Sequence, residues 1–231
     1  MWPLRRALRG AASALFAWDD HSTVLRRPTY FNDVPAAPAA LTDLHGLRPL
    51  AILGDMITTD HLAPAGRIGR DSPAGRYLHA HNTPASEFHS YGIRRGNHEV
   101  AMRATLAAPR LKNEMLPGSE GGNTKLQPDG NTLAIFDAAE IYRSRGEAAI
   151  IIAGREYGAG SSRDWAAKGP AMIGVRAVVA ESYEKFIAPT SSAWACCRWH
   201  SYPPRAAPCN STAAKPLMSS ALPAGSHHTP H

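Results

Sequence analysis

Runs of apolar residues, separated by turn signals, divide the middle of the chain into short strands. The stretch "AAIIIAG" at 148–154 is continuously apolar and β-branched, which predicts a buried strand, and "GVRAVVAES" at 174–182 predicts another. A shorter apolar run at 50–53 ends at a Gly-Asp pair, as a strand does. The segment "STVL" at 22–25 is also strand-like, and the Pro-Asp-Gly turn at 128–130 separates two further strands.

Helical signals lie between these strands. Ser72 is a suitable N-cap for a short helix at 72–78, because proline follows it at the first helical position. A second helix is expected within "NHEVAMRATLAA", 97–108. A third is expected to be capped by Asp137 and to end at Gly146.

The stretch "YGAGSSRDWAAKG", 157–169, joins the two buried strands through a glycine-rich turn and a helix that we expect to begin at Ser161. Gly158 and Gly160 permit the backbone angles of a tight turn. Strand, helix and strand together form a βαβ unit. Its connection places the start of the helix at the carboxyl edge of the sheet, where ligands of such folds usually bind.

The residues at this helix start are suited to an anion. The first amides of a helix are unpaired and partly positive, and they attract carboxylates or phosphates. Ser161 and Ser162 add hydroxyls, and Arg163 adds a two-pronged donor that matches a carboxylate. The stretch lacks both an adjacent histidine base and the lysine of a phosphate loop. The residues alone leave open a carboxylate site and an ordinary Gly-Ser helix cap.

Two other polar clusters are candidates. "TTDH" places Asp60 and His61 beside two hydroxyls, and "YGIRRGNHEV" places Arg94 and Arg95 in a loop before a helix. Taken alone, an Asp-His pair is usually a turn or a cap, and an Arg pair is usually solvated. Their interest depends on what the fold brings near them.

Length and charge limit the class of protein. The 231 residues suffice for one large domain with extensions, and no apolar run is long enough to span a membrane. The net charge is +6, and all of this excess lies in the ends, 1–17 and 187–231, which contain no acidic residue. The region 18–186 is therefore neutral. Nucleic-acid binding is not expected, because it needs a basic face on the folded core.

The ends suggest little chemistry of their own. The three cysteines, Cys196, Cys197 and Cys209, all lie near the C-terminus without the spacing of a metal site, so we expect no metal ligands in this chain. The arginine-rich, acid-free start resembles a mitochondrial presequence, but its Ala/Arg/Pro/Gly-rich composition suits a GC-rich bacterial gene, and we favour the latter. We expect a cytoplasmic protein, with the mitochondrial matrix as the alternative.

Several long segments, in this order, resemble the C-terminal part of the aconitase family. They are "WDDHSTVLRRPTYF", "GDMITTDHLAPAGRI", "SPAGRYL", "SYGIRRGNHEVAMR", "FDAAEIY" and "IIAGREYGAGSSRDWAAKGP" with "GVRAVVAESYEK". The resemblance covers about 18–186. It implies an α/β fold: the swivelling β/β/α domain of aconitases, with the βαβ unit described above and a disordered or irregular C-terminal tail. Three regions follow: an extension and linker (1–47), the truncated swivel domain (48–186) and an aberrant tail (187–231).

The resemblance also implies roles for the candidate residues. Ser161 resembles the catalytic base that removes a proton from a substrate carbon. Asp60, with His61 beside it, resembles the active-site acid. The ligands of a tricarboxylate substrate would be Ser162, Arg163 and Arg95. The parent enzyme would hold a 4Fe-4S cluster through three cysteines of earlier domains, which have no counterpart in this chain, so the isolated chain is expected to be inactive.

The resemblance ends abruptly after "AESYEK". The family continues with Ile-His-Arg, then Ser or Thr, then Asn-Leu-Val-Gly-Met-Gly, whereas this chain reads "FIAPTSSAWACC". One inserted base after a suitable codon for Lys185 restores Ile-His-Arg-Thr-Asn-Leu-Val-Gly-Met-Gly. We therefore expect a one-base frameshift there. The proline-rich sequence beyond it would bury too little apolar surface to offset its chain entropy.

The leading hypothesis is a C-terminal fragment of an aconitate hydratase, which interconverts citrate and isocitrate through cis-aconitate. A fragment of 2-methylisocitrate dehydratase is a close alternative, because "GDMITTDH" and "KNEM" suit that branch too. A small hydro-lyase subunit that acts in trans with cluster-bearing domains is another. An RNA-binding module is a fourth, against which the neutral core argues.

Overall fold

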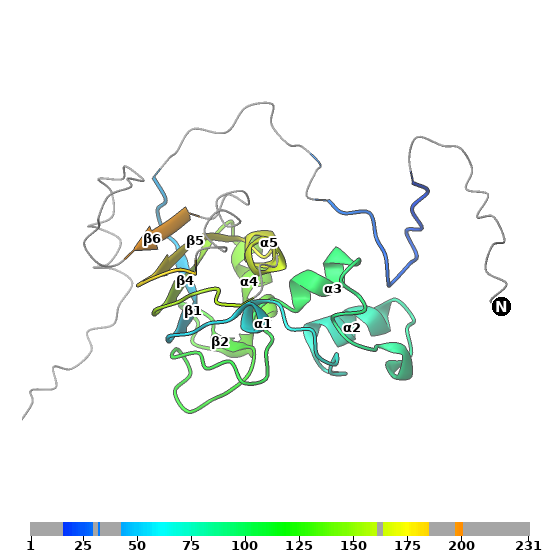
Figure 1. Ribbon diagram of the computed structural model, residues 1–231, viewed down its shortest axis with the longest axis horizontal. Coiled ribbons are helices and arrows are strands. Elements are labelled where there is room, and N and C mark those ends of the chain that lie inside the picture. Colours follow the sequence, from blue (N-terminus) through cyan, green and yellow to red (C-terminus); the bar gives the residue numbers. More distant parts are fainter. Residues whose placement is uncertain (1–15, 30–31, 33–42, 161–163, 185–196, 201–231) are drawn as a thin grey trace, which may run out of the picture.

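The computed structural model describes residues 16–29, 32, 43–160, 164–184 and, for the backbone alone, 197–200. These residues form a mixed α/β fold, which confirms the predicted fold class (Figure 1). The elements in chain order are β1 (Arg48–Leu53), α1 (Thr59–Leu62), α2 (Pro73–Ala80), the 3-10 helix η1 (Ala85–Glu87), α3 (His98–Arg103), β2 (Asn123–Lys125), β3 (Thr132–Ala134), α4 (Ile135–Ser144), β4 (Ala149–Ala153), α5 (Trp165–Met172), β5 (Val175–Ala180) and β6 (Cys197–His200).

The main sheet has the strand order β1-β4-β5-β6, and its neighbouring strands are parallel. The predicted unit of β4, α5 and β5 is confirmed, and β2 pairs with β3 as an antiparallel hairpin around the predicted turn. At the centre of the sheet Ile151 lies opposite Ala51 on one side and Val178 on the other. Its side chain is fully buried, as expected for an apolar strand covered on its faces.

The strand β6 was not predicted. Its backbone pairs with β5, with Cys197 opposite Ala177, and it lies inside the region 187–231 for which we expect an irregular tail. The rest of that tail lies outside the described residues. The boundaries at 47 and 186 stay predictions.

The helix starts agree with the sequence in part. Ser72 caps α2 as predicted, since its hydroxyl accepts a hydrogen bond of 3.0 Å from the amide of Gly75. The predicted cap at Asp137 is wrong, because α4 already begins at Ile135. Asp137 instead lies in the first turn of α4, where a negative charge is favourable, and accepts two hydrogen bonds from Arg76.

Two other predictions differ from the structure. Residues 22–25 form no strand, because their polar contacts go to a loop and not to a neighbouring strand. The helix expected within 97–108 is present as α3 but ends at Arg103. The C-terminal end of α4 matches, since Gly146 follows it with a positive φ of 71°, a conformation that glycine adopts at little cost.

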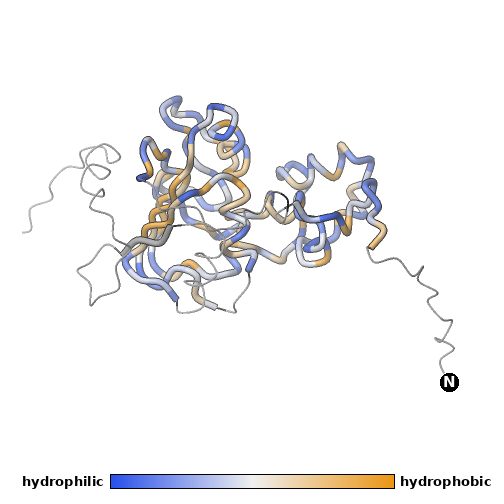
Figure 2. The backbone as a smooth tube through the Cα atoms, turned by 90° about the horizontal axis from the view of Figure 1, so that it is seen from above, coloured by the Kyte–Doolittle hydropathy of each residue, from blue (hydrophilic) through white to orange (hydrophobic). Residues whose placement is uncertain are grey.

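The core has one large apolar cluster around the sheet and a smaller one between α2 and α3. In the smaller cluster Leu78 of α2 and Val100 of α3 are fully buried. A third group, made by Ala63, Ala101 and Trp165, joins the end of α1 to α3 and α5. Figure 2 shows the apolar strands gathered in one body and the α2–α3 region extending from it as a smaller lobe.

Replacement of Ile151 by alanine should lower the free energy of unfolding by about 2–5 kcal/mol, because a fully buried aliphatic side chain leaves a cavity. The matched control is Ile93→Ala, since Ile93 is 59% exposed. That change should alter the free energy of unfolding by no more than about 0.5 kcal/mol. Denaturant unfolding of both variants measures the difference, and equal losses would contradict the placement of β4 at the centre of the core.

The stability should also fall as the pH drops below about 6.5, because of His98. Burial lowers the pKa of this histidine, and Arg26 and Arg103 add to the lowering while Glu99 opposes it. The unfolded chain therefore binds a proton at a higher pH than the folded chain does, so acid favours unfolding.

The comparison of His98→Gln with His79→Gln tests this. The His79 side chain is exposed, so its replacement should leave the pH dependence of the melting temperature unchanged. His98→Gln should flatten the fall in melting temperature between pH 7 and 5. The same slope in both variants would show that His98 does not cause it.

Candidate functional site

The loops that follow β1 and β4 run side by side beyond the carboxyl edge of the sheet. Both strands are parallel, so their ends meet at this edge. The amide of Met56 donates to the carbonyl of Arg155 at 2.8 Å, and the amide of Gly158 donates to the carbonyl of Ile57 at 2.6 Å. Two residues after Ile57, the amide of Thr59 donates to a carbonyl of the second loop. The two loops are therefore paired along their length and not only where the strands end.

The last of these bonds brings the start of α1 to the glycine turn. The amide of Thr59 donates to the carbonyl of Ala159 at 2.9 Å. Gly160 has a φ of 122°, and a Cβ on it would lie 2.9 Å from the hydroxyl of Thr59. Only glycine meets both conditions without strain. Asp60, the next residue along α1, thus lies close to the point where the chain enters 161–163.

Ser161, Ser162 and Arg163 themselves lie outside the described residues. The structure describes the residues on both sides of them, Gly160 and Asp164. Helix α5 follows at once, with Asp164 as its N-cap, so a helix start does lie beside the three residues, although the first described helical residue is Trp165 and not Ser161.

A buried lysine holds the start of α5. The ammonium of Lys168 lies 2.6 Å from the carboxylate of Asp164, and its side chain is only 8% exposed. It also lies 4.3 Å from the ring centre of Trp165, at the distance of a cation–π contact. Because a buried ammonium needs such partners, Lys168 fixes the residue that directly follows Arg163. The sequence analysis missed this lysine, although an Asp-Lys pair at the i,i+4 spacing of a helix was the available signal.

His61 has a structural contact of its own. The backbone N–H of Thr58 donates to its Nδ1 at 3.0 Å. A backbone amide can only donate, so Nδ1 is the acceptor of this bond. His61 therefore caps α1 through one ring nitrogen. Asp60 beside it is exposed.

An ion pair that the sequence did not indicate joins the loops after β1 and β4. Asp55, after β1, accepts hydrogen bonds from the backbone and the guanidinium of Arg155, after β4. The backbone bond of Arg155 and then its side-chain bond lower the pKa of Asp55. A separation of 100 residues hid this pair from any local pattern.

The two arginines of the "RRG" loop have different surroundings. Arg94 is 2% exposed, and its guanidinium donates to backbone carbonyls. Arg95 is half-buried, and its NH2 atom is buried without a hydrogen-bond partner in the described part of the chain. The loop leads into α3, which packs against α5 through Ala101 and Trp165. The Arg95 loop therefore joins α3, and α3 contacts α5, the helix that follows the glycine turn.

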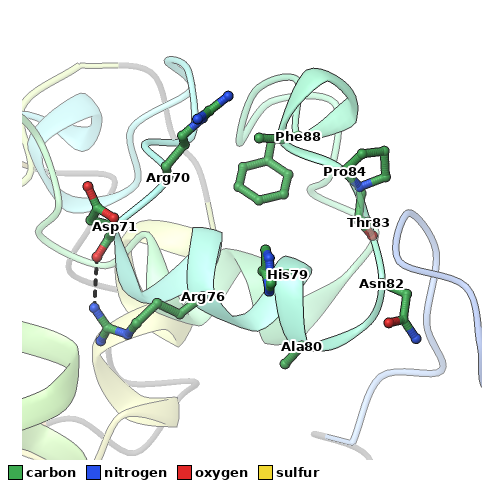
Figure 3. Close-up of a pocket in the computed structure, with 10 residues that line it drawn as sticks. Arg70, Asp71, Arg76, His79, Ala80, Asn82, Thr83, Pro84 and Phe88 are labelled. Carbon is green, nitrogen blue, oxygen red and sulfur yellow. Dashed lines mark hydrogen bonds between the residues drawn. The ribbon is translucent and has the colours of Figure 1, made fainter.

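The cavity of about 720 Å³ lies elsewhere. Figure 3 shows it between α2 and the turn into η1, with Arg70, His79 and Phe88 around it. None of the predicted site residues lines it. Of its arginines, Arg76 is already bound to the carbonyl of Asp71 and to Asp137. The cavity is therefore separate from the residues predicted at the sheet edge.

Two features, a metal-binding group and a membrane-spanning helix, are not found among the residues that the structure describes. Among them, no three His, Cys, Asp or Glu side chains form a group able to hold a metal ion. No helix in the same residues has the length and apolar character needed to cross a membrane. The three cysteines lie outside the residues whose side chains are described.

Comparison with known proteins agrees with the resemblance. A family model described as the aconitase C-terminal domain matches residues 74–188. The chain is 53% identical over 180 residues to aconitate hydratase A of Pseudomonas aeruginosa, and 52% identical over 173 residues to that of Escherichia coli. These matches cover 78% and 75% of this chain but only 20% and 19% of the relatives. The chain therefore spans about a fifth of the length of the curated relatives it matches.

A solved structure also matches in part. It is a 3-isopropylmalate dehydratase from Methanocaldococcus jannaschii, with 19% identity, a TM-score of 0.30 and coverage of 61% of this chain and 53% of that one. A superposition of this quality says nothing about the site. The family match and the identities near 50% are decisive: the chain belongs to the aconitase family and carries its C-terminal domain.

Proposed function

We propose that this chain supplies the substrate-closing domain of an aconitate hydratase, a hydro-lyase that interconverts citrate and isocitrate through cis-aconitate. The observation that carries the proposal is the bond between Thr59 and Ala159. It holds Asp60 close to Gly160, the last described residue before 161–163, and this supports a shared site for the candidate acid and the candidate base. The relatives are named aconitate hydratase A, which favours an aconitate hydratase over a 2-methylisocitrate dehydratase.

The proposed chemistry follows from these positions. Ser161, as the base, takes the proton from the substrate carbon next to the carbinol carbon. The electron pair of that C–H bond forms the double bond of cis-aconitate, and the C–O bond breaks. Asp60 protonates the departing hydroxyl, which leaves as water, and rehydration reverses the steps. A serine hydroxyl can act as a base only where nearby positive groups lower its pKa, as a helix start and Arg163 would do.

The substrate carboxylates would be bound by Ser162, Arg163 and Arg95. Arg95 is the better candidate of the loop pair, because Arg94 is committed to backbone carbonyls while the NH2 atom of Arg95 has no partner in the described residues. His61 would orient Asp60 indirectly, since it caps the helix that bears both.

The 4Fe-4S cluster that the family implies does not fit the described residues. No group of metal-binding side chains is present among them. A cluster would have to be held by other protein, either in a longer polypeptide or in a separate chain that acts with this one. The bacterial relatives support the cytoplasm as the compartment.

The isolated chain should bind a tricarboxylate weakly. Tricarballylate is a suitable probe, because it has the three carboxylates but cannot be dehydrated. Arg95→Gln should weaken its binding about 10- to 100-fold, since a charge-assisted pair contributes about 1.5–3 kcal/mol. Arg110→Gln is the matched control, because Arg110 is exposed in a distant loop. Titration calorimetry measures both, and equal affinities in the two variants would contradict the role of Arg95.

Turnover should need the parts of an aconitate hydratase that the match to this chain does not cover. The purified chain, treated with iron and sulfide, should form no cis-aconitate.

A fusion of this domain to the rest of the Pseudomonas aeruginosa relative should be active. In that fusion Ser161→Ala should lower kcat about 10²- to 10⁴-fold with little change in KM, because the base acts only in the transition state. If Ser161 is only a helix cap, the same variant would keep its turnover and lose about 1 kcal/mol of stability. Activity of the isolated chain would contradict the proposal directly.

A further inference from the structure

The loop of Arg95 is bound on both sides of that residue to one distant segment. This segment, residues 22–26, is here called the strap. Figure 1 shows it as the blue trace beside α2 and α3. The amide of Arg26 donates to the carbonyl of Gly96 at 3.0 Å. The carbonyl of Thr23 accepts from NH1 of Arg94 at 2.7 Å and from the side-chain amide of Asn97 at 3.0 Å.

Arg94 needs the strap to complete its bonding. Its Nε donates to the carbonyl of Phe88 and its NH2 to the carbonyl of Glu87, while NH1 donates to the carbonyl and the hydroxyl of Thr23. Burial lowers the pKa of Arg94, with Glu87 opposing, as expected for a charge removed from water. A buried guanidinium with unbonded N–H groups is unfavourable, so loss of the strap would release this side chain toward solvent.

The packing at Gly96 is equally close. A Cβ on this residue would lie 2.8 Å from Cδ1 of Leu25 and 3.3 Å from the carbonyl oxygen of Val24. The backbone of the strap and the backbone of the loop therefore touch directly. The strap has a second anchor outside the loop, because the guanidinium of Arg26 donates to the hydroxyl of Tyr77 on α2 at 3.0 Å.

We propose that the strap is a positioning element for Arg95, with Thr23 and Arg94 as the positioning residues. It fixes the residues before and after Arg95, whose own NH2 atom is buried and has no hydrogen-bond partner in the described part of the chain. The ligand part of this inference rests on the proposed function. Its physical basis is that an arginine held in place loses less conformational freedom when it grips a carboxylate.

The test uses the full chain and the variant Gly96→Ala, which pushes on the strap without removing any group of Arg94 or Arg95. Amide hydrogen exchange of residues 92–97 should become at least tenfold faster, and the exchange of β4 should not change. The NMR signal of the Arg95 Nε–H, assigned by its loss in Arg95→Lys, should show greater mobility. The double variant Gly96→Ala/Leu25→Ala should restore most of both, because it removes Cδ1 of Leu25, the closer of the two atoms that the new methyl group meets.

The binding of tricarballylate separates this inference from the proposed function. If the wild-type chain binds it, Gly96→Ala should weaken the affinity about tenfold and the double variant should recover it. If the wild-type chain does not bind it, the proposed function fails, while the exchange measurement still decides the role of the strap. Unchanged exchange of 92–97 in Gly96→Ala, or an effect that the double variant does not reverse, would overturn the inference.

Discussion

The hydrogen bond from the amide of Thr59 to the carbonyl of Ala159 is the contact on which the candidate site depends. It exists because β1 and β4 are parallel neighbours, so the loops after them leave the sheet at one edge. The two backbones can approach to this distance because Gly160 has no side chain that would clash with the hydroxyl of Thr59. The glycine of the turn is therefore required by the approach of α1 as well as by its own backbone angle.

A second constraint is that the adjacent residues Arg94 and Arg95 have different roles. A buried guanidinium must be bonded at each of its nitrogens, and the carbonyls around Arg94 do this. Such an arginine cannot also grip a substrate. The NH2 atom of Arg95, in contrast, has no hydrogen-bond partner among the described residues. The hydrogen bonds of Arg94 also fix the loop in which Arg95 lies.

Local patterns were enough to predict the sheet and its βαβ unit. The apolar run of β4, the glycine turn and the cap at Ser72 each depend on residues next to one another. The cap at Asp137 was placed wrongly, because the partner that attracts this carboxylate is Arg76 on another helix. The strand β6 was also not foreseen, since it lies in the stretch after Lys185 that departs from the family sequence.

The site could be predicted only as separate pieces. Local sequence alone did not indicate a function for Asp60 or Arg95, and their roles were predicted from the family resemblance. The contacts that hold the pieces, Asp55 with Arg155 and Thr23 with Arg94, join residues far apart in the chain. No periodicity or motif can show such pairs, because they arise from the folded arrangement of the sheet edge and the loop.

The most direct test of the central claim, that the α1 start and the glycine turn belong to one substrate site, is an NMR titration of the labelled chain with tricarballylate. The amide signals of residues 58–61 and 158–160 should shift together and give a single dissociation constant. Shifts confined to one of the two segments, or two different dissociation constants, would contradict the claim.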